Sequence, residues 1–337
     1  MINRGVYGGL LSIMLLTGGL LGCGDGGATE SKTAGKHSGT YPYQIVTTCG
    51  MVTDIVRQVA GDKANVQGLM GETVDPHLYK PTRHDVTLLQ SADVIFYSGL
   101  MLEGRMADTF ARVGRDGKPV YAVTEGIDPK LLREPPEFAG HFDPHVWMDV
   151  SAWSQCVAFV ATALGEFDPP NAALYQQNAE AYRAELKKLD DYVRQSINTI
   201  PKPQRVLVTA HDAFGYFGHA YDIEVQSVQG ITTESEASVK DINDLVNFVT
   251  ERKVQALFVE SSVSSQNIQA VIEGAQRKGA KVEIGGNLFS DAMGQTGTYE
   301  GTYIGMIDHN ATLITRALGG TAPELGLNGK LSSSAKE

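Results

Sequence analysis

The tripeptide Asp-Pro-His occurs twice in the sequence, at Asp75–His77 and at Asp143–His145, each time with an aromatic residue two positions later. One histidine in a turn usually has only a local role, but the repetition favours a shared task. Proline fixes part of the backbone, so an imidazole beside it loses less entropy when it binds a ligand. Neutral imidazoles are common metal ligands. The two aspartates could orient the imidazoles as hydrogen-bond acceptors, or they could simply open turns.

Two further candidate ligands follow predicted strands in the second half of the chain. His211 comes directly after the apolar run Arg205–Ala210, and Asp291 lies shortly after Lys281–Gly285. Because ligands of open α/β sheets bind beyond the carboxyl ends of the strands, we expect both side chains at the edge that also carries the two motif histidines. Three imidazoles and one carboxylate suit a divalent first-row metal. Glu260, at the tip of another predicted strand, competes as a ligand or as a group that orients one.

Each of these residues also has a simpler interpretation. His211 could be a buried histidine that is hydrogen-bonded at a strand end, and Asp291 could cap a helix. The other histidines are weaker candidates, since they lie in the polar N-terminal stretch, on predicted helices or at unsuitable spacings: His37, His84, His141, His219 and His309. The sequence has no HExxH or G-x-S-x-G motif, and no glycine-rich phosphate loop after a strand.

Short β-rich runs alternate with helical patterns twice along the chain. Several runs are continuously apolar, which is typical of strands buried on both faces of a parallel sheet. The order predicts an α/β fold with two lobes, each containing a mainly parallel four-stranded sheet. The first four strands are expected at Tyr43–Thr48, Asn65–Met70, Asp93–Ser98 and Pro119–Val123, and the second four at Arg205–Ala210, Glu224–Val228, Ala256–Glu260 and Lys281–Gly285. Helices are expected between them, for example at Met51–Ala60 and Asp241–Lys253.

One long helix is predicted between the two lobes, over residues 168–200. Asp168 can cap it, two prolines suit its first turn, and Pro201 marks its end. About 30 helical residues would span about 45 Å, the length of a whole domain. Its apolar positions recur in steps of three and four, which places them on one face: Tyr175, Ala179, Tyr182, Leu186, Leu189, Val193 and Ile197. We expect both lobes to pack against this helix, with the metal site in the cleft between them.

The N-terminus predicts export and a lipid anchor. Residues 1–22 read as a signal peptide, and Leu20–Cys23 resembles the bacterial lipobox, in which the cysteine is lipidated. Residues 23–41 are small and polar, so we expect a flexible tether. The remaining boundaries place the first lobe at 42–167, the second lobe at 201–320, and a disordered tail at 321–337.

Composition restricts the possible partners. The formal net charge is -11, and basic residues never form a run longer than a pair. Nucleic acids and anionic membrane surfaces are therefore poor partners, whereas cations are suitable ones. Apart from Cys23 the chain has only Cys49 and Cys156. These two could pair in an oxidising compartment or remain as buried thiols, and the sequence leaves both options open.

Several stretches resemble the metal-specific solute-binding lipoproteins of ABC importers, the group that contains TroA-, ZnuA- and PsaA-type proteins. The resemblance covers essentially the whole chain after the leader and is strongest to the TroA type. The most specific stretches are DPHLYKPTRHDV, DPHVWMDV, VTAHDAFGYFG, VQGITTESEAS, FVESSV, GGNLFSDAMG and EGTYIGM.

The resemblance implies two α/β lobes, one long linking helix and a single metal ion in the cleft. The implied ligands are His77, His145, His211 and Asp291. The third ligand is histidine in zinc-binding and TroA-like members and glutamate in one set of manganese binders. Zinc-specific members also tend to carry a long His-rich loop before the second ligand, whereas this chain has only LLREPPEFAGHF there.

The implied function is transport rather than catalysis. We expect an extracytoplasmic, lipid-anchored monomer that captures Zn²⁺ or Mn²⁺ and delivers it to an ABC permease and its ATPase, with Fe²⁺ as a weaker candidate. One alternative is a zinc metallohydrolase, which would need an open metal position and a nearby base. A second alternative is a surface adhesin on the same fold.

Overall fold

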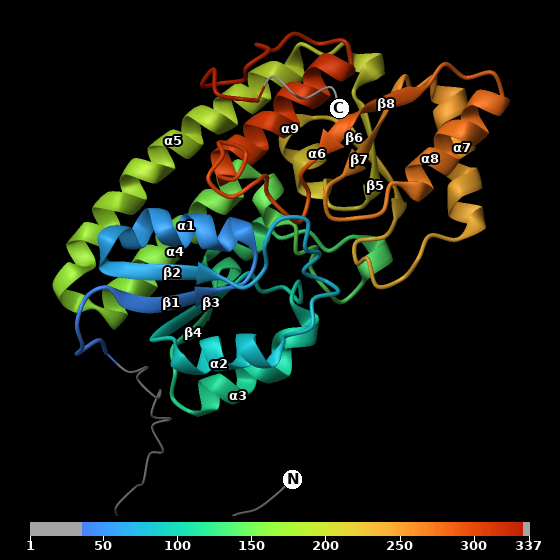
Figure 1. The fold of residues 1–337 in the computed structure, drawn as a ribbon. Coiled ribbons are helices and arrows are strands. Elements are labelled where there is room, and N and C mark those ends of the chain that lie inside the picture. The colour runs from blue at the N-terminus through green and yellow to red at the C-terminus, as the bar shows by residue number, and fades with distance from the viewer. Residues whose placement is uncertain (1–35, 333–337) are drawn as a thin grey trace, which may run out of the picture. The chain divides into compact units, whose positions relative to one another are not determined.

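The computed structural model describes residues 36–332, and contacts group Ala34–Glu337 into one compact unit. The predicted α/β architecture and all eight predicted strands are present (Figure 1). The predicted signal peptide, Cys23 and most of the tether lie outside the described residues. Within the described part, no helix combines the length and apolarity needed to cross a membrane.

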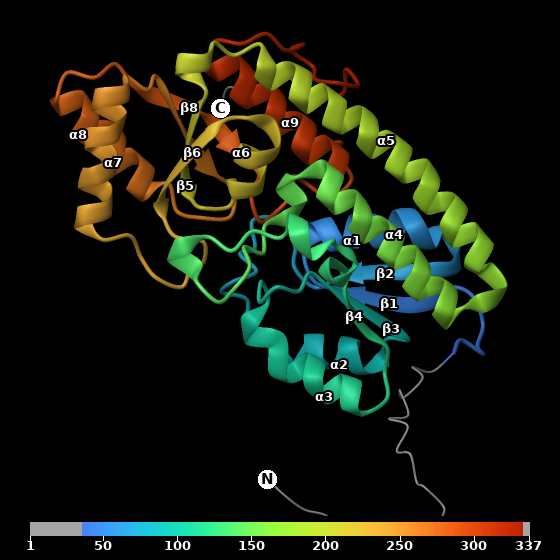
Figure 2. The same cartoon turned by 180° about the vertical axis from the view of Figure 1, so that it is seen from behind.

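The first lobe contains the four-stranded parallel sheet that the sequence predicts. Its strands are arranged in the order β2-β1-β3-β4, with bounds β1 Tyr43–Thr47, β2 Ala64–Gly68, β3 Val94–Tyr97 and β4 Val120–Ala122. The helices on one face are α1 (Gly50–Ala60) and α4 (Val150–Phe167), and those on the other face are α2 (Arg83–Ser91) and α3 (Ala107–Arg115) (Figure 2). Helices on both faces explain why strands such as β3 are apolar almost throughout.

Side-chain caps fix where the helices next to the site begin. The Thr82 hydroxyl accepts a hydrogen bond from the Asp85 backbone N–H, and the Asp85 carboxylate accepts one from the Thr82 backbone N–H, a capping box that starts α2. Asp149 accepts hydrogen bonds from the first backbone amides of α4. These caps also end the two loops that carry the Asp-Pro-His motifs. Each motif histidine therefore lies a few residues before a helix start that a side-chain cap holds in place.

The second lobe differs from the prediction in one respect. Its strands form two parallel pairs instead of one four-stranded sheet: β5 (Val206–His211) with β6 (Glu224–Gln229), and β7 (Ala256–Glu260) with β8 (Glu283–Leu288). Strands β5 and β7 contact each other. However, the last two amides of β5 donate to the carboxylate of Glu260, at 2.7 and 2.9 Å, so that a side chain takes the place of a backbone acceptor.

Four helices cover the second-lobe strands, two on each face. They are α6 (Gly215–Tyr221), α7 (Val239–Arg252), α8 (Gln266–Arg277) and α9 (Tyr303–Ala317). Alternate residues of β5 point to opposite faces, as the pleat requires. Leu207 joins the apolar core with α6 and α9, whereas Val206 and Val208 pack in a second core with α7 and α8.

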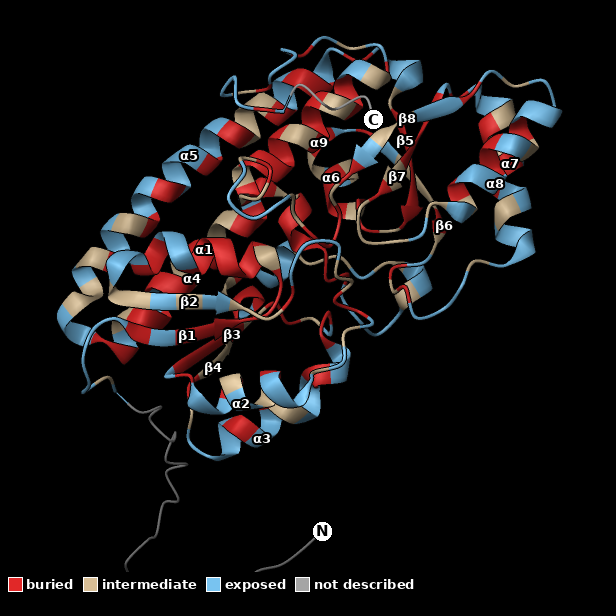
Figure 3. Cartoon of the chain, viewed as in Figure 1, coloured by how far each residue is buried: buried red, intermediate tan, exposed pale blue. Residues whose placement is uncertain are grey.

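The long helix α5 (Ala172–Asn198) is 27 residues, or about 40 Å, and follows a short 3₁₀ turn at Pro169–Asn171. It is therefore slightly shorter than the predicted 168–200. All seven apolar positions expected on its inner face are buried (Figure 3). Asp168 lies at the start of that 3₁₀ turn, but its side chain accepts no hydrogen bond from a backbone amide of the turn or of α5. Its carboxylate instead accepts hydrogen bonds from side chains of Tyr41, Tyr175 and Asn171, because Asp168 ends α4 and faces this polar cluster.

The two lobes share one apolar core. The larger core cluster contains the first-lobe strands, the inner faces of α1, α4 and α5, and residues of α6 and α9 such as Phe217 and Met306. Cys49 and Cys156 are buried in this core and are both free thiols. Since α5 and α9 contact each other along the core, the lobes are joined by packing as well as by chain connections.

The predicted disordered tail is wrong for its described part, 321–332. Ala322 and Leu331 are buried, and the backbone amide of Leu327 donates to the carboxylate of Asp308 on α9 at 2.9 Å. The buried carboxylates of Asp308 and Glu300 accept hydrogen bonds from tail amides, which gives a segment with few apolar residues a fixed position. Residues 333–337 lie outside the described part.

Candidate metal centre

The structure brings together all four side chains that the sequence selects as candidate ligands. His77 lies on the loop after β2, and His145 directly precedes a 3₁₀ turn (Val146–Met148) that leads into α4. His211 is the last residue of β5, and Asp291 lies three residues beyond β8. All four are buried, and one potential ligand atom from each lies within 4.8 Å of the other three.

The distances describe a small cluster with His145 at its centre. Nε2 of His145 lies 3.2 Å from Nε2 of His77 and 3.4 Å from Nε2 of His211. The carboxylate of Asp291 faces the imidazoles with both oxygens: Oδ1 is 3.3 Å from His145 Nε2, and Oδ2 is 3.3 Å from His211 Nε2 and 3.9 Å from His77 Nε2. Three imidazole nitrogens and two carboxylate oxygens therefore surround one small volume.

The imidazole of His145 is oriented by its own motif. Nδ1 lies 2.8 Å from Oδ1 of Asp143, which also accepts the backbone N–H of His145 at 3.0 Å. A proton held on Nδ1 leaves the lone pair of Nε2 free to face the cluster. The indole of Trp147 packs edge-on against the imidazole, and its N–H donates to the Ser290 carbonyl beside Asp291 at 2.9 Å. The second motif thus connects one candidate ligand to the loop that carries another.

Glu260 performs the same task for His211. Its Oε2 lies 2.6 Å from Nδ1 of His211, and its Oε1 accepts the backbone N–H of that histidine. Glu260 is therefore an orienting group rather than a fifth member of the cluster, which resolves its role between the two that the sequence leaves open. Carboxylate–histidine pairs of this type fix the tautomer of metal-binding imidazoles.

Asp75 behaves differently from Asp143, although the two motifs have the same sequence. Its Oδ1 accepts the backbone N–H of His77 at 2.8 Å, and its Oδ2 accepts the hydroxyl of Thr233 at 2.5 Å. The carboxylate thus shapes the turn and contacts the second lobe. Thr233 was missed as a functional candidate, even though it lies in the stretch VQGITTESEAS that contributes to the family resemblance.

Burial and charge act in opposite directions on the titrating groups. Burial lowers the pKa of His77 to about 3. Burial also acts to lower the pKa of His145, but the hydrogen bond to Asp143 and the nearby negative charge of Asp291 outweigh it and raise this pKa to about 9. For His211, the charges of Asp291 and Glu260 overcome burial and raise its pKa well above the usual value. Burial opposes ionisation of Asp291, yet the two histidines hold its pKa well below the usual range.

The donor set fits a cation. Both carboxylate oxygens of Asp291 are fully buried without a hydrogen-bond partner among the described residues. A buried carboxylate that has only imidazoles beside it needs a positive charge in the cluster, which a cation held among the three imidazoles would supply. Asp291 therefore does not act as the helix cap that was its alternative interpretation.

The other histidines lie outside the cluster. His84, His141 and His219 are exposed, and His84 lies on α2 as expected. His37 packs against aromatic rings at the start of the described chain instead of belonging to a free tether, and His309 on α9 lies with Nε2 2.9 Å from the Asn287 carbonyl.

Comparison with known proteins agrees with the fold. Residues 45–317 match the family described as "ZnuA: Zinc-uptake complex component A periplasmic". The match covers well over half of the chain, and the chain therefore belongs to this family.

Two relatives are similar over nearly their whole length. The manganese-binding lipoprotein MntA of Bacillus subtilis is 43% identical over 92% of this chain and 98% of that protein. The zinc-binding protein TroA of Treponema pallidum is 46% identical over 81% of this chain and 88% of that protein. The solved structure of TroA superposes with a TM-score of 0.79 over 82% of this chain and 99% of that chain.

Proposed function

We propose that this protein is the extracytoplasmic substrate-binding component of an ABC importer and that it binds one divalent metal ion as cargo. His77, His145 and His211 would each provide Nε2, and Asp291 would provide its carboxylate. The observation that carries the proposal is the buried carboxylate of Asp291, which faces three imidazoles and has no hydrogen-bond partner among the described residues. Family membership and relatives named as zinc- or manganese-binding support the same cargo.

The spacing of the cluster is compatible with zinc, without distinguishing it from the other candidate metals. Zinc–nitrogen bonds of about 2.0–2.1 Å in tetrahedral geometry place neighbouring ligands about 3.3 Å apart. Four of the five distances given above lie between 3.2 and 3.4 Å. Zinc also binds nitrogen donors more tightly than manganese, so tight zinc binding alone does not define the transported ion. We therefore propose zinc or manganese as cargo, with Fe²⁺ as the weaker candidate.

A transport role fits the cluster better than hydrolysis. A catalytic zinc needs an open position for water and a base beside it. Here both oxygens of Asp291 face the imidazoles, and the nearby carboxylates of Asp143 and Glu260 are engaged with histidine Nδ1 atoms. We propose that the protein is not an enzyme. The adhesin alternative does not require four converging donor atoms.

The anchor and the partners follow from the same proposal. A lipid on Cys23 would hold the monomer beside the membrane, where a permease and its ATPase would receive the metal. The sequence before residue 36 and relatives named as lipoproteins support this placement.

The first test is the metal content of a soluble chain that begins after Cys23, purified without chelator or affinity metal. We expect about one zinc or manganese per chain by mass spectrometry, and loss of that metal in His211→Ala. The exposed His219 provides a matched control, because His219→Ala should retain the metal. Absence of metal in the wild type, with no uptake of added zinc or manganese, would refute the four-ligand site.

A further inference from the structure

The aspartates of the two Asp-Pro-His motifs make different contacts. Asp143 contacts the imidazole of its own histidine, whereas Asp75 contacts only the backbone of His77 and gives its second oxygen to Thr233. Among the described residues, the polar groups in contact with the His77 imidazole are His145 and Asp291, which both belong to the cluster. The direction of this imidazole is therefore set by its turn, and one end of that turn is bonded to the second lobe.

Thr233 is itself held by the strand that pairs with the His211 strand. It lies on the loop 230–238 between β6 and α7, and it is buried. The side-chain amide of Gln229 donates to the carbonyls of Thr233 and Ser235, at 3.2 and 2.8 Å. Gln229 is the register partner of His211 in the β5–β6 pair. A continuous chain of contacts thus leads from His77 in the first lobe to His211 in the second.

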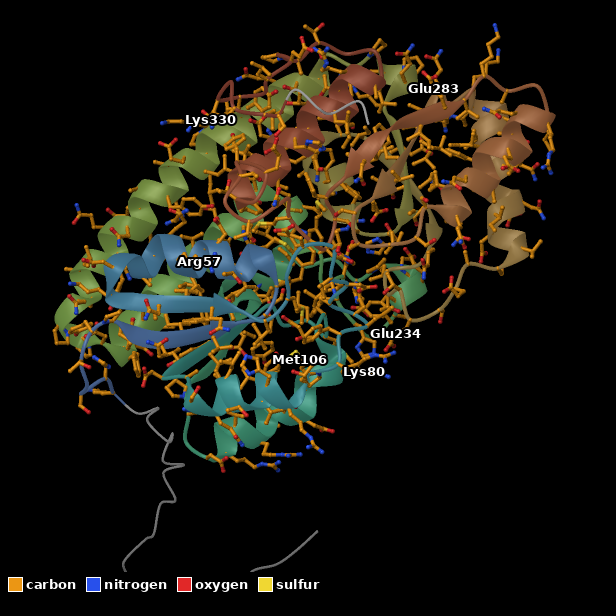
Figure 4. All side chains as sticks on the ribbon, viewed as in Figure 1. Arg57, Lys80, Met106, Glu234, Glu283 and Lys330 are labelled. Atoms are coloured by element: carbon orange, nitrogen blue, oxygen red, sulfur yellow. The ribbon has the colours of Figure 1, made fainter. Side chains whose placement is uncertain are left out.

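A second contact joins the same loop to the first lobe. Arg105 donates to the carboxylate of Glu234 at 3.1 Å, and Figure 4 labels Glu234 on the loop. Both side chains are partly exposed, so this ion pair contributes little by itself. The hydroxyl–carboxylate contact of Thr233 is the more consequential one, because it is less exposed than the ion pair and its acceptor is a carboxylate.

We propose that Thr233 is a positioning residue for His77, which holds that ligand in place through Asp75 only while the loop 230–238 remains in contact with Asp75. The inference rests on the proposed function of the cluster as a metal site. When the loop separates from Asp75, the turn that carries His77 loses its outer support, while His145 and His211 keep their own carboxylate partners. His77 is therefore the ligand that leaves first, and the Thr233 contact controls the rate of metal release.

The test measures zinc release from the loaded chain after mixing with excess chelator in a stopped-flow instrument. Thr233→Val removes the hydroxyl and nearly preserves the volume. We expect release about tenfold faster, the effect of one hydrogen bond to a charged group. Thr233→Ser retains the hydroxyl and should restore the wild-type rate. Thr232→Val on the same loop is the matched control and should have no effect, since no hydrogen bond is described for that side chain.

A double-mutant cycle separates positioning from a general effect on closure. In a His77→Ala background, Thr233→Val should cause no further acceleration, because the ligand through which it acts is gone. An equal acceleration with and without His77 would overturn the proposal, as would a wild-type rate for Thr233→Val. Failure of the wild-type chain to bind zinc is detected before any variant is compared, and it would overturn the proposed function itself. Circular dichroism of each metal-free variant verifies the fold.

Discussion

Two of the three buried histidines of the cluster, His145 and His211, each have one carboxylate at the Nδ1 atom. Asp143 is two residues from its histidine in the sequence, whereas Glu260 is on a different strand. Both contacts direct Nε2 toward Asp291, so the imidazole rings are oriented before a metal arrives. Such preorganisation reduces the entropic cost of binding.

Glu260→Gln should weaken zinc binding by about ten- to a hundredfold. The glutamine oxygen can still accept the two β5 amides, but its NH₂ group would then donate to Nδ1 of His211. The proton would move to Nε2 and block the coordinating lone pair. Competition with a chromophoric chelator measures the affinity. The exposed Glu251→Gln on α7 is the control, and equal affinities for the two variants would refute the orienting role.

Zinc affinity should rise with pH up to about pH 9. The pKa of His145 in the metal-free protein is raised to about 9, above the usual value of 6.5, so the imidazole carries a proton at neutral pH that the metal must displace. Each displaced proton changes the affinity about tenfold per pH unit. Titrations in buffers between pH 6 and pH 9 measure the slope, and a flat profile would show that no proton is released.

The stability of the metal-free fold should change with pH in the opposite direction to the zinc affinity. Because the folded-state pKa of His145 exceeds the unfolded value, the protonated imidazole stabilises the metal-free fold below about pH 6.5. That contribution is lost as the pH rises through about 9. The same titration series should therefore show the melting temperature of the metal-free protein falling over this interval while zinc binding strengthens.

At the scale of elements, α5 is the support that both lobes share. Its buried face contacts α1 and α4 of the first lobe and α9 of the second. The periodicity of its apolar residues predicted this face correctly, because a surface helix must place its apolar side chains on the side that faces the core.

Leu186→Ala on the inner face of α5 should reduce the free energy of unfolding by about 2–5 kcal/mol, since Leu186 is fully buried in the shared core. Glu180→Ala on the exposed face of the same helix should change it by less than about 0.5 kcal/mol. Denaturant titration of the metal-free proteins measures both. Similar losses of unfolding free energy for the two variants would show that the buried face of α5 does not stabilise the shared core.

At the scale of the whole molecule, the continuous core limits how far the lobes can separate. Residues of α6 and α9 from the second lobe belong to the same apolar cluster as the first-lobe sheet. A wide opening would expose this surface to water at a cost of about 25 cal/mol per Å². Metal release is therefore expected to involve local movement of loops such as 230–238.

Small-angle scattering of metal-free and zinc-loaded protein should give nearly superimposable curves. The reason is that the shared core and α5 remain packed in both states, while the cluster is confined to loop and strand ends. A large decrease in the radius of gyration on loading would contradict this expectation. The His211→Ala variant, mixed with zinc, controls for effects of the ion on the solvent.

The sequence was informative wherever a local pattern has only one stable outcome. Strand and helix positions followed from hydrophobic periodicity, and the four candidate ligands followed from their places after strand ends and from the repeated motif. Glu260 was recognised as relevant but not as an orienting group, because strand order brings its carboxylate to His211 and no local pattern encodes that contact. The tail and the Asp168 cap were mispredicted for a similar reason, since their hydrogen-bond partners are distant in sequence.

By itself, then, the sequence determined which residue types could bind a metal and which segments form the elements that carry them. Those properties depend on side-chain chemistry and on periodicity over a few turns. Only the tertiary structure decided that the aspartates of the two Asp-Pro-His motifs make different contacts and that Thr233 of the second lobe contacts Asp75 of the first. It also decided that the second-lobe strands form two pairs. Each of these depends on which atoms meet after folding, because a hydrogen bond forms only between groups that packing has brought within about 3 Å.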